Sequence, residues 1–162
     1  MVDYLLFATE RYAVPILAPL AQALQVSRHA VSAWFEGGAR GLALPGVRQV
    51  GLREALALRP RAVFSAANWV PPFISGAKVQ LFHGFNVQKR EDNRGHFRVR
   101  GLFDLYCTQG PATTAPFRAL AQREGHFAVV ETGWPKLDPI FRDDGGRSAA
   151  LRVPAAGRPV IL

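Results

Sequence analysis

The sequence predicts an α/β fold in which a parallel sheet carries helices on both faces. Short apolar runs recur along the chain, each with the length of a strand that is buried on both sides. Segments with helical spacing of apolar residues lie between these runs. Of the 162 residues, 49% are hydrophobic and 20% are charged, which provides enough apolar surface for one folded domain.

The first half of the chain alternates between the two patterns. Residues 4–8 form a nearly continuous apolar run, and apolar side chains then recur at helical spacing from Ile16 to Leu24. Proline is tolerated near a helix start, so Pro15 is taken as the first helical residue. The expected elements are a strand at 4–8, a helix from about 15 to 25, a strand at 29–35, a loop at 36–41, a helix at 52–58, and a strand at 62–66.

The second half repeats the alternation around a basic connection. Apolar residues nearly vanish between residues 86 and 100, and the strand pattern resumes at residue 102. The expected elements are a loop at 68–72, a strand at 78–82, a strand at 102–108, a turn at 109–111, a helix at 112–124, and a strand at 127–131. This order predicts a Rossmann-like sheet.

The last 21 residues predict a domain boundary. Residues 1–141 are expected to form one Rossmann-like domain, and residues 142–157 form a polar, glycine-containing linker. Residues 158–162 begin a new apolar strand, which we interpret as the start of a truncated second domain. The alternative is that this strand completes the first sheet, and the sequence leaves both interpretations open.

Charge and cysteine content restrict partners and compartment. The net charge is +8, which favours phosphorylated substrates, anionic lipid surfaces or nucleic acid. Cys107 is the sole cysteine, so no disulfide can form within the chain, and a reducing cytoplasm is the simplest compartment. No basic leader precedes the first apolar run, and the longest uncharged stretches fall short of the roughly 20 residues of a membrane span. Peripheral membrane contact remains open.

Polar residues follow several of the expected strands. In open α/β sheets ligands gather outside the carboxyl ends of the strands. His83 ends an apolar strand and precedes Gly84, and an imidazole with a pKa near neutrality can take a proton from a hydroxyl. His83 is therefore the candidate catalytic residue, with a structural role as the alternative. The other residues expected at this edge are Thr9, Glu10, Arg11, Asn68, Asn86, Gln109, Gly110, Pro111 and residues 132–135.

Several common sites have no matching motif. No HxH or HExxH spacing occurs, so no metal site is predicted. No GxGxxG or GxxxxGK[ST] string occurs, which disfavours kinases, GTPases and dinucleotide-binding enzymes, and we expect no cofactor. Gly110 and Pro111 before a helix could present backbone amides to an anion, and a simple strand-to-helix turn explains them equally well.

Three strings together resemble one enzyme family. Residues 79–84, Val-Gln-Leu-Phe-His-Gly, are followed by Lys89; residues 103–111 include Phe-Asp-Leu-Tyr, Thr108 and Gly-Pro; residues 132–138 read Thr-Gly-Trp-Pro-Lys-Leu-Asp. In this order and spacing they resemble the amino-terminal domain of CDP-glycerol glycerophosphotransferases, which act in teichoic-acid or capsule synthesis. Phe82 stands where the family often has tryptophan, and Lys136 where it often has arginine.

The resemblance implies a GT-B arrangement, in which two Rossmann-like domains face a cleft. His83 would activate an acceptor hydroxyl for attack on the β-phosphate of a CDP-alcohol, releasing CMP. The donor motifs of the family lie in the second domain, so this chain is expected to be inactive without that domain. The residues expected to bind the acceptor or shape the cleft are Glu10, Gly84, Asn86, Lys89, Gly110, Pro111, Gly133, Lys136 and Asp138.

The basic segment suggests where a polyanionic or lipid-linked acceptor would bind, on the inner face of the cell membrane. The residues expected to contact such a surface are Arg90, Arg94, Arg98 and Arg100, and a solvated loop is the alternative. Two other functions remain open. One is another GT-B glycosyltransferase or a sugar-nucleotide epimerase, and the other is a basic binding module. Aromatic and basic residues are not interleaved, so we do not expect nucleic acid as a partner.

Overall fold

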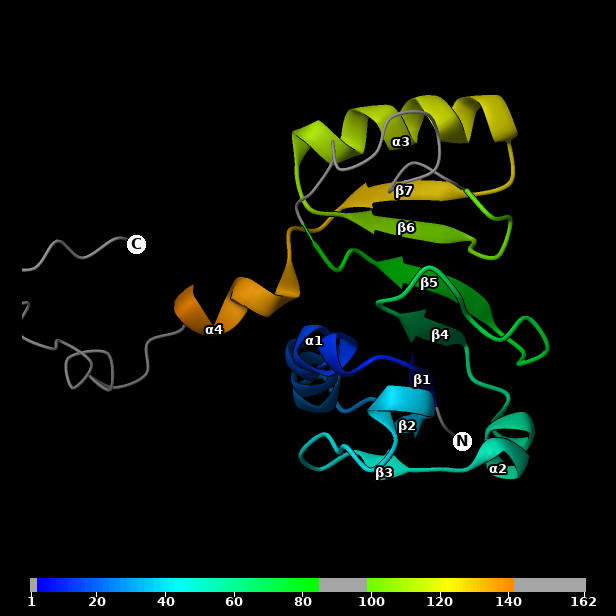
Figure 1. Ribbon diagram of the computed structural model, residues 1–162, viewed down its shortest axis with the longest axis vertical. Helices are drawn as coiled ribbons and strands as arrows, with labels where there is room; N and C mark the ends of the chain where they lie inside the picture. The colour runs from blue at the N-terminus through cyan, green and yellow to red at the C-terminus, as the bar shows by residue number, and fades with distance from the viewer. Residues whose placement is uncertain (1–2, 85–98, 142–162) are drawn as a thin grey trace, which may run out of the picture.

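A computed structural model describes residues 3–84 and 99–141, which form a seven-stranded, all-parallel sheet (Figure 1). The strand order across the sheet is β3-β2-β1-β4-β5-β6-β7. The strands are β1 (Tyr4–Ala8), β2 (Val31–Phe35), β3 (Arg48–Gln49), β4 (Ala62–Ser65), β5 (Ala77–Leu81), β6 (Leu105–Thr108) and β7 (Ala128–Glu131). This is the Rossmann-like α/β fold that the sequence predicts.

The described residues also form four α-helices and three 3-10 turns, of which η3 and α4 follow the last strand and the others lie between strands. The helices are α1 (Val14–Val26), α2 (Leu52–Leu58), α3 (Pro111–Glu124) and α4 (Asp138–Phe141). The 3-10 turns are η1 (Arg11–Ala13), η2 (Gly37–Ala39) and η3 (Pro135–Leu137). No helix within residues 3–84 and 99–141 is both long enough and apolar enough to cross a lipid bilayer.

The strand order reverses at β1: strands β2 and β3 are added on one side of β1, and β4 to β7 on the other. From β1 the chain moves outward through β2 to β3, and then returns to place β4 on the other side of β1. Tyr4 of β1 is paired with Val31 of β2 on one side and with Ala62 of β4 on the other. Loops diverge at such a reversal and leave room for a ligand, so the site is expected above the ends of these strands.

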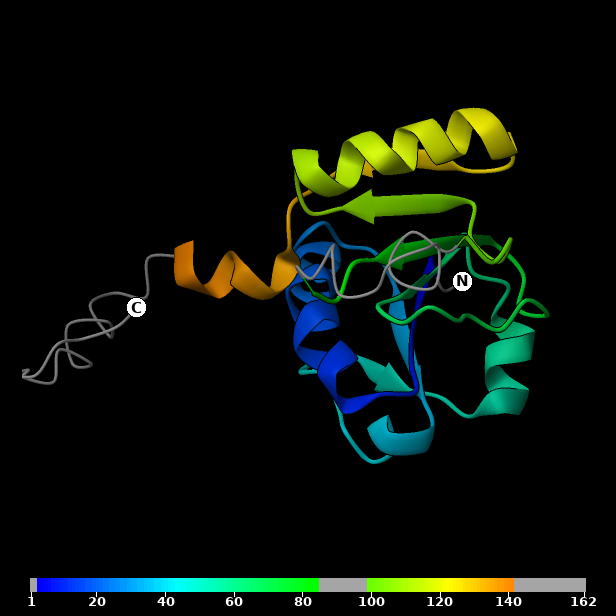
Figure 2. The ribbon, with the colours of Figure 1, turned by 45° about the horizontal axis from the view of Figure 1, so that its top comes forward.

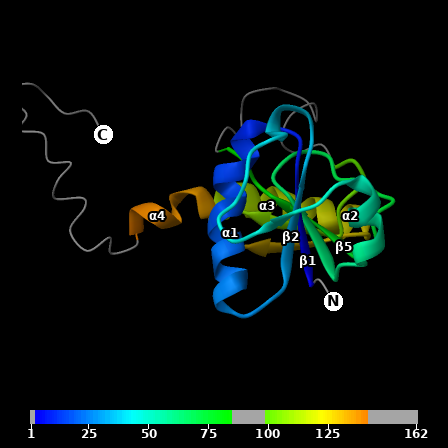
Figure 3. The ribbon, with the colours of Figure 1, turned by 90° about the horizontal axis from the view of Figure 1, so that it is seen from below.

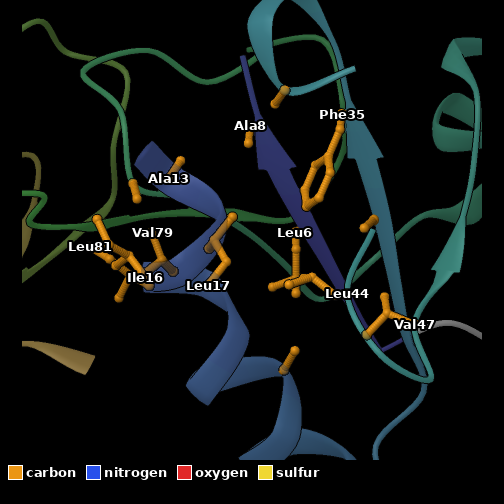
Figure 4. Close-up of a cluster of buried hydrophobic side chains, with 14 of the residues drawn as sticks. Leu6, Ala8, Ala13, Ile16, Leu17, Phe35, Leu44, Val47, Val79 and Leu81 are labelled. Carbon is orange, nitrogen blue, oxygen red and sulfur yellow. The ribbon is translucent and has the colours of Figure 1, made fainter. Parts of the chain in front are cut away.

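Alternating side chains of β1 build two cores on opposite faces of the sheet. Leu6 and Ala8 pack on the α1 side with Ile16 and Leu17, as Figure 4 shows. Leu5 and Phe7 pack on the other side, in the cluster that contains residues of α2 and α3. Figure 3 shows α1 and α2 on opposite sides of β1 and β2. The expected covering of both faces is confirmed.

The largest differences from the expected elements are at strand boundaries. The second strand begins at Val31 rather than His29, because the His29 amide still donates to the Leu24 carbonyl at the end of α1. The strand expected to begin at residue 102 is β6, which begins at Leu105. The amide of Lys78 in β5 donates to the Asp104 carboxylate rather than to a backbone carbonyl, so the residues before Asp104 do not pair with β5. The expectations did not include β3, whose two exposed polar residues show no apolar run.

After β7 the chain crosses back to the outer surface of α1. The turn η3 packs against α1, and α4 extends from it beyond the sheet (Figure 2). Ile140 and Phe141 of α4 are largely exposed. The expected linker at 142–157 and the expected strand at 158–162 lie outside the described residues.

Candidate functional site

Two aromatic rings meet at the carboxyl edge of the sheet. Tyr12 belongs to η1, directly after β1, and His83 follows β5. Their ring centroids lie 5.1 Å apart and the ring planes are inclined by 38°. Only β4 separates β1 from β5 in the sheet, so this contact spans the end of β4 beside the chain reversal. The structure therefore places His83 at the edge where the sequence predicts the site.

Glu10 lies close to the same pair. Burial raises the pKa of the Tyr12 phenol, and the negative charge of Glu10 raises it further. Tyr12 thus keeps its proton well into the alkaline range. The phenol can donate a hydrogen bond to a ligand at neutral pH, while the exposed Glu10 carboxylate can only accept one.

Two consecutive glycines allow the loop after β2 to pack against the loop after β1. Gly37 has φ +53°, and a Cβ atom there would lie 3.0 Å from the Thr9 carbonyl oxygen. The Ala39 amide donates to that same oxygen over 3.1 Å. A larger residue at Gly37 would push η2 away from the Thr9–Glu10 segment, so this glycine helps to hold the edge in shape.

Buried hydrogen bonds connect the ends of β4 and β5. The Gln80 side chain donates from Nε2 to the Ala67 carbonyl over 3.1 Å and to the Asn68 Oδ1 over 3.0 Å. The Ser65 hydroxyl donates to the Trp69 carbonyl over 3.0 Å and accepts a bond from the Ala67 amide. These bonds hold the exposed Asn68 beside the end of β5.

The ends of β6 and β7 are joined by buried threonines. The hydroxyl oxygens of Thr108 and Thr114 lie 2.7 Å apart, and the Thr114 hydroxyl lies 2.6 Å from the Glu131 carboxylate. The Gly110 carbonyl accepts bonds from the amides of Thr113 and Thr114. Because the amides of Thr113 and Thr114 are used within the turn and a carboxylate lies nearby, this geometry favours a strand-to-helix turn over an anion cradle.

The predicted site residues fall into separate groups. Glu10, His83 and Gly84 lie at the ends of β1 and β5, and Gly110, Pro111 and Gly133 lie at the ends of β6 and β7. Lys136 instead lies in η3 beside α1, with its Nζ 5.3 Å from the Trp134 ring centroid. Asp138 is exposed at the start of α4. The predicted residues outside the described ranges are Asn86, Lys89, Arg90, Arg94 and Arg98.

Arg100 is described and exposed. It lies just before Gly101 and Asp104, which line a hollow of about 480 Å³ together with Lys78 and His126. This hollow is at the amino edge of the strands, opposite His83. Arg100 and His83 therefore do not share one site within the described residues.

A larger groove of about 650 Å³ runs along the outer surface of α1. Its lining includes Pro15, Ala18, Pro19, Leu44 and Lys136, and does not include His83. The predicted catalytic histidine and the predicted cleft residue Lys136 therefore border different surfaces.

Sequence reasoning missed several polar contacts at this edge. Tyr12 is absent from the residues expected at this edge, although its place four residues after β1 could have indicated the strand-end loop. The set of Thr108, Thr114 and Glu131 gave no signal, because its members meet only after α3 folds back onto β6 and β7.

Within residues 3–84 and 99–141, no three His, Cys, Asp or Glu side chains gather closely enough to hold a metal ion. Comparison with known protein families, with curated proteins and with solved structures finds no match to this chain. The fold itself defines the class: a Rossmann-like α/β protein with polar side chains at the carboxyl edge of a parallel sheet.

Proposed function

We propose that this chain is the acceptor-binding domain of an enzyme resembling the CDP-glycerol glycerophosphotransferases. Two of the strings that carry the resemblance include the carboxyl ends of β5 and β6, and the third begins directly after β7, so all three lie at the ends of neighbouring strands of one sheet. The observation that carries the proposal is the contact of His83 with Tyr12 at the chain reversal.

The proposed reaction transfers an alcohol phosphate to a hydroxyl group. His83 accepts the proton of the acceptor hydroxyl, the oxygen forms a bond to the β-phosphorus of the CDP-alcohol, and the bond to the CMP oxygen breaks. Such transfers depend on positioning and on stabilising phosphate charge. Tyr12 packs against the imidazole on one side and limits its orientations. A second lobe supplies the donor site in this proposal.

The acceptor in this proposal is a phosphorylated polymer or a lipid-linked starter on the inner face of the cell membrane. The net charge of +8 supports an anionic partner. Replacing Arg90, Arg94, Arg98 and Arg100 together by glutamine should weaken binding to vesicles that contain anionic lipid. Removing the same number of charges at Arg28, Arg48, Arg53 and Arg59 is the matched control, and equal weakening in both variants would contradict a specific role for the basic segment.

The proposed function is tested with a protein that continues beyond Leu162 into a donor-binding lobe. Transfer of labelled glycerol phosphate from CDP-glycerol should be lost in His83→Ala, while CDP-glycerol still binds. His126→Ala is the matched control, because His126 lies at the opposite edge of the sheet, and it should retain transfer. Turnover of UDP-sugars in place of CDP-glycerol would instead favour another GT-B enzyme, and full activity of His83→Ala would remove His83 from the mechanism.

A further inference from the structure

Helix α1 is apolar on its outer surface as well as on the surface that faces the sheet. None of the 13 residues of Val14–Val26 is charged. Ile16 and Leu17 pack toward the sheet (Figure 4), whereas Pro15 and Val26 are exposed. A surface helix ordinarily carries charged side chains on its outer face, so an outer face without them indicates that a ligand or partner covers it.

This outer face forms one wall of the groove of about 650 Å³. The residues of α1 that line the groove have the spacing of a single helix face, and they are Pro15, Ala18, Pro19, Gln22 and Gln25. At about 1.5 Å per residue, Pro15 and Gln25 lie about 15 Å apart along the helix. A groove of this length suits an extended chain better than a compact ring.

The other walls are held close to α1. The Gln25 side chain donates from Nε2 to the Pro45 carbonyl over 3.4 Å, and Leu44 and Pro45 both line the groove. Lys136 and Pro139 line it from η3 and α4, and η3 packs against α1 (Figure 1). Proline and alanine side chains have almost no rotamer freedom to lose, so a ligand that covers this lining orders few side chains.

Lys136 is the only charged side chain among the described residues that line the groove. Its ammonium lies 5.3 Å from the Trp134 ring centroid. Within residues 3–84 and 99–141 this ammonium forms no ion pair with a carboxylate. An unpaired cation beside an apolar groove is complementary to a ligand that joins a negative charge to an apolar body.

We propose that this groove binds a long-chain fatty acid, with the hydrocarbon chain along α1 and the carboxylate at the Lys136 ammonium. The inference goes beyond the proposed function, because the groove does not include His83. Pockets of about 300–1,000 Å³ with apolar walls and few polar groups are usual sites for small apolar ligands. Burial of the chain supplies the affinity, and the charge determines which end lies at Lys136.

The test uses the chain of 162 residues with labelled alanine methyl groups, and dodecanoate as the probe below its micellar concentration. Nuclear magnetic resonance follows the Ala18 methyl signal, which should move and reach saturation. Octanoate should bind about tenfold or more weakly, because fewer methylene groups are buried. Dodecyltrimethylammonium has the same chain with the opposite charge, and it should bind more weakly than dodecanoate.

Ala18→Leu is the variant that fills the groove. Ala18 is half-buried in the lining, so the larger side chain should weaken dodecanoate binding about fivefold or more. Ala23→Leu is the matched control, because it makes the same change at an exposed position of α1 outside the lining. It should change the affinity less than about twofold.

Lys136→Gln tests the charge on an exposed residue, where the substitution does not disturb the core. It should weaken dodecanoate binding about twofold to fivefold, the effect of a partly solvated ion pair, and should not weaken binding of dodecyltrimethylammonium. Arg53→Gln is the matched control, because Arg53 is exposed on α2, on the opposite side of the sheet (Figure 3). It should leave both affinities unchanged.

Four outcomes would overturn the inference. An Ala18 signal that dodecanoate does not move would remove the groove as its site. Equal weakening in Lys136→Gln and Arg53→Gln would show a general charge effect. An Ala18 signal that moves with protein concentration alone would show that a second copy of the chain covers the groove. Binding to phosphatidylglycerol vesicles without a response to dodecanoate would assign this surface to a membrane. None of these outcomes bears on transfer at His83, so the proposed function is tested separately.

Discussion

Tyr12 and Glu10 form a pair whose interaction can be measured without any ligand. Burial and the nearby Glu10 carboxylate both raise the pKa of the Tyr12 phenol, with burial the larger cause. In Glu10→Gln the pKa of Tyr12 should fall but stay above its ordinary value, because burial remains. Titration of the labelled tyrosine rings by nuclear magnetic resonance measures this change.

Glu124→Gln is the control for that titration, because Glu124 is on the surface at the end of α3 and pairs with Arg123. It should leave the Tyr12 titration unchanged. An unchanged pKa in Glu10→Gln would show that Glu10 does not act on the phenol, and the arrangement of the strand ends around Tyr12 would need revision.

Gln80 has a structural role that a stability measurement can isolate. In Gln80→Leu the Ala67 carbonyl and the Asn68 oxygen lose their donor. Ala67 is buried, so its carbonyl is the costlier loss, while the exposed Asn68 can turn to water. The free energy of unfolding should fall by about 1–3 kcal/mol in urea denaturation. Gln49→Leu on the exposed β3 should change it by less than about 0.5 kcal/mol, and similar losses in both variants would contradict this role.

At the scale of elements, the connection between β4 and β5 depends on Gly76. This residue has φ +88°, and a Cβ atom there would lie 2.2 Å from the Pro60 carbonyl oxygen. Gly41 has a similar φ of +82° but no atom within 4 Å of a Cβ. Gly41→Ala therefore measures the backbone strain alone, about 1–2 kcal/mol.

Gly76→Ala adds a collision with the backbone to that strain. It should lower the free energy of unfolding by about 1–3 kcal/mol more than Gly41→Ala, again in urea denaturation. Equal losses in the two variants would mean that the segment before β5 can move away from Pro60 at no cost.

The sequence predicts those elements whose signal is local. The bounds of β1 and α2 agree with expectation, because a buried apolar run and a short helical pattern each lie within a few residues. The strand β3 could not be predicted, since its two polar residues are held by pairing with β2. The same distinction holds for the candidate site. The position of His83 at a strand end can be predicted from its own strand, whereas its contact with Tyr12 depends on the order of the strands in the sheet.

The whole molecule should respond to alkaline pH through its one cysteine. Burial raises the pKa of the Cys107 thiol above its ordinary value of 9.0, more than the hydrogen bond with Thr132 lowers it. Below that value the thiol is protonated in the folded and unfolded states alike. Above it the unfolded chain releases the proton first, so the folded state binds more protons and stability falls as pH rises.

Cys107→Ala removes this contribution and should flatten the decline of unfolding free energy as pH rises above the ordinary thiol value of 9.0, by at most about 1.4 kcal/mol per pH unit. Lys78, whose pKa burial lowers, contributes with the opposite sign. It is present in both proteins, so it cancels in their difference. Parallel pH profiles of the two proteins would contradict the role of the thiol.

The two cores of the sheet are built from residues between Tyr4 and Val129, and η3 and α4 follow on the outside of α1. If the domain boundary expected after residue 141 is right, a chain that ends at Phe141 should unfold cooperatively with a free energy within about 0.5 kcal/mol of the 162-residue chain. Urea denaturation of both chains measures this difference. A loss of several kcal/mol would mean instead that residues 158–162 complete this sheet, and the expectation that they begin a donor-binding lobe would be wrong.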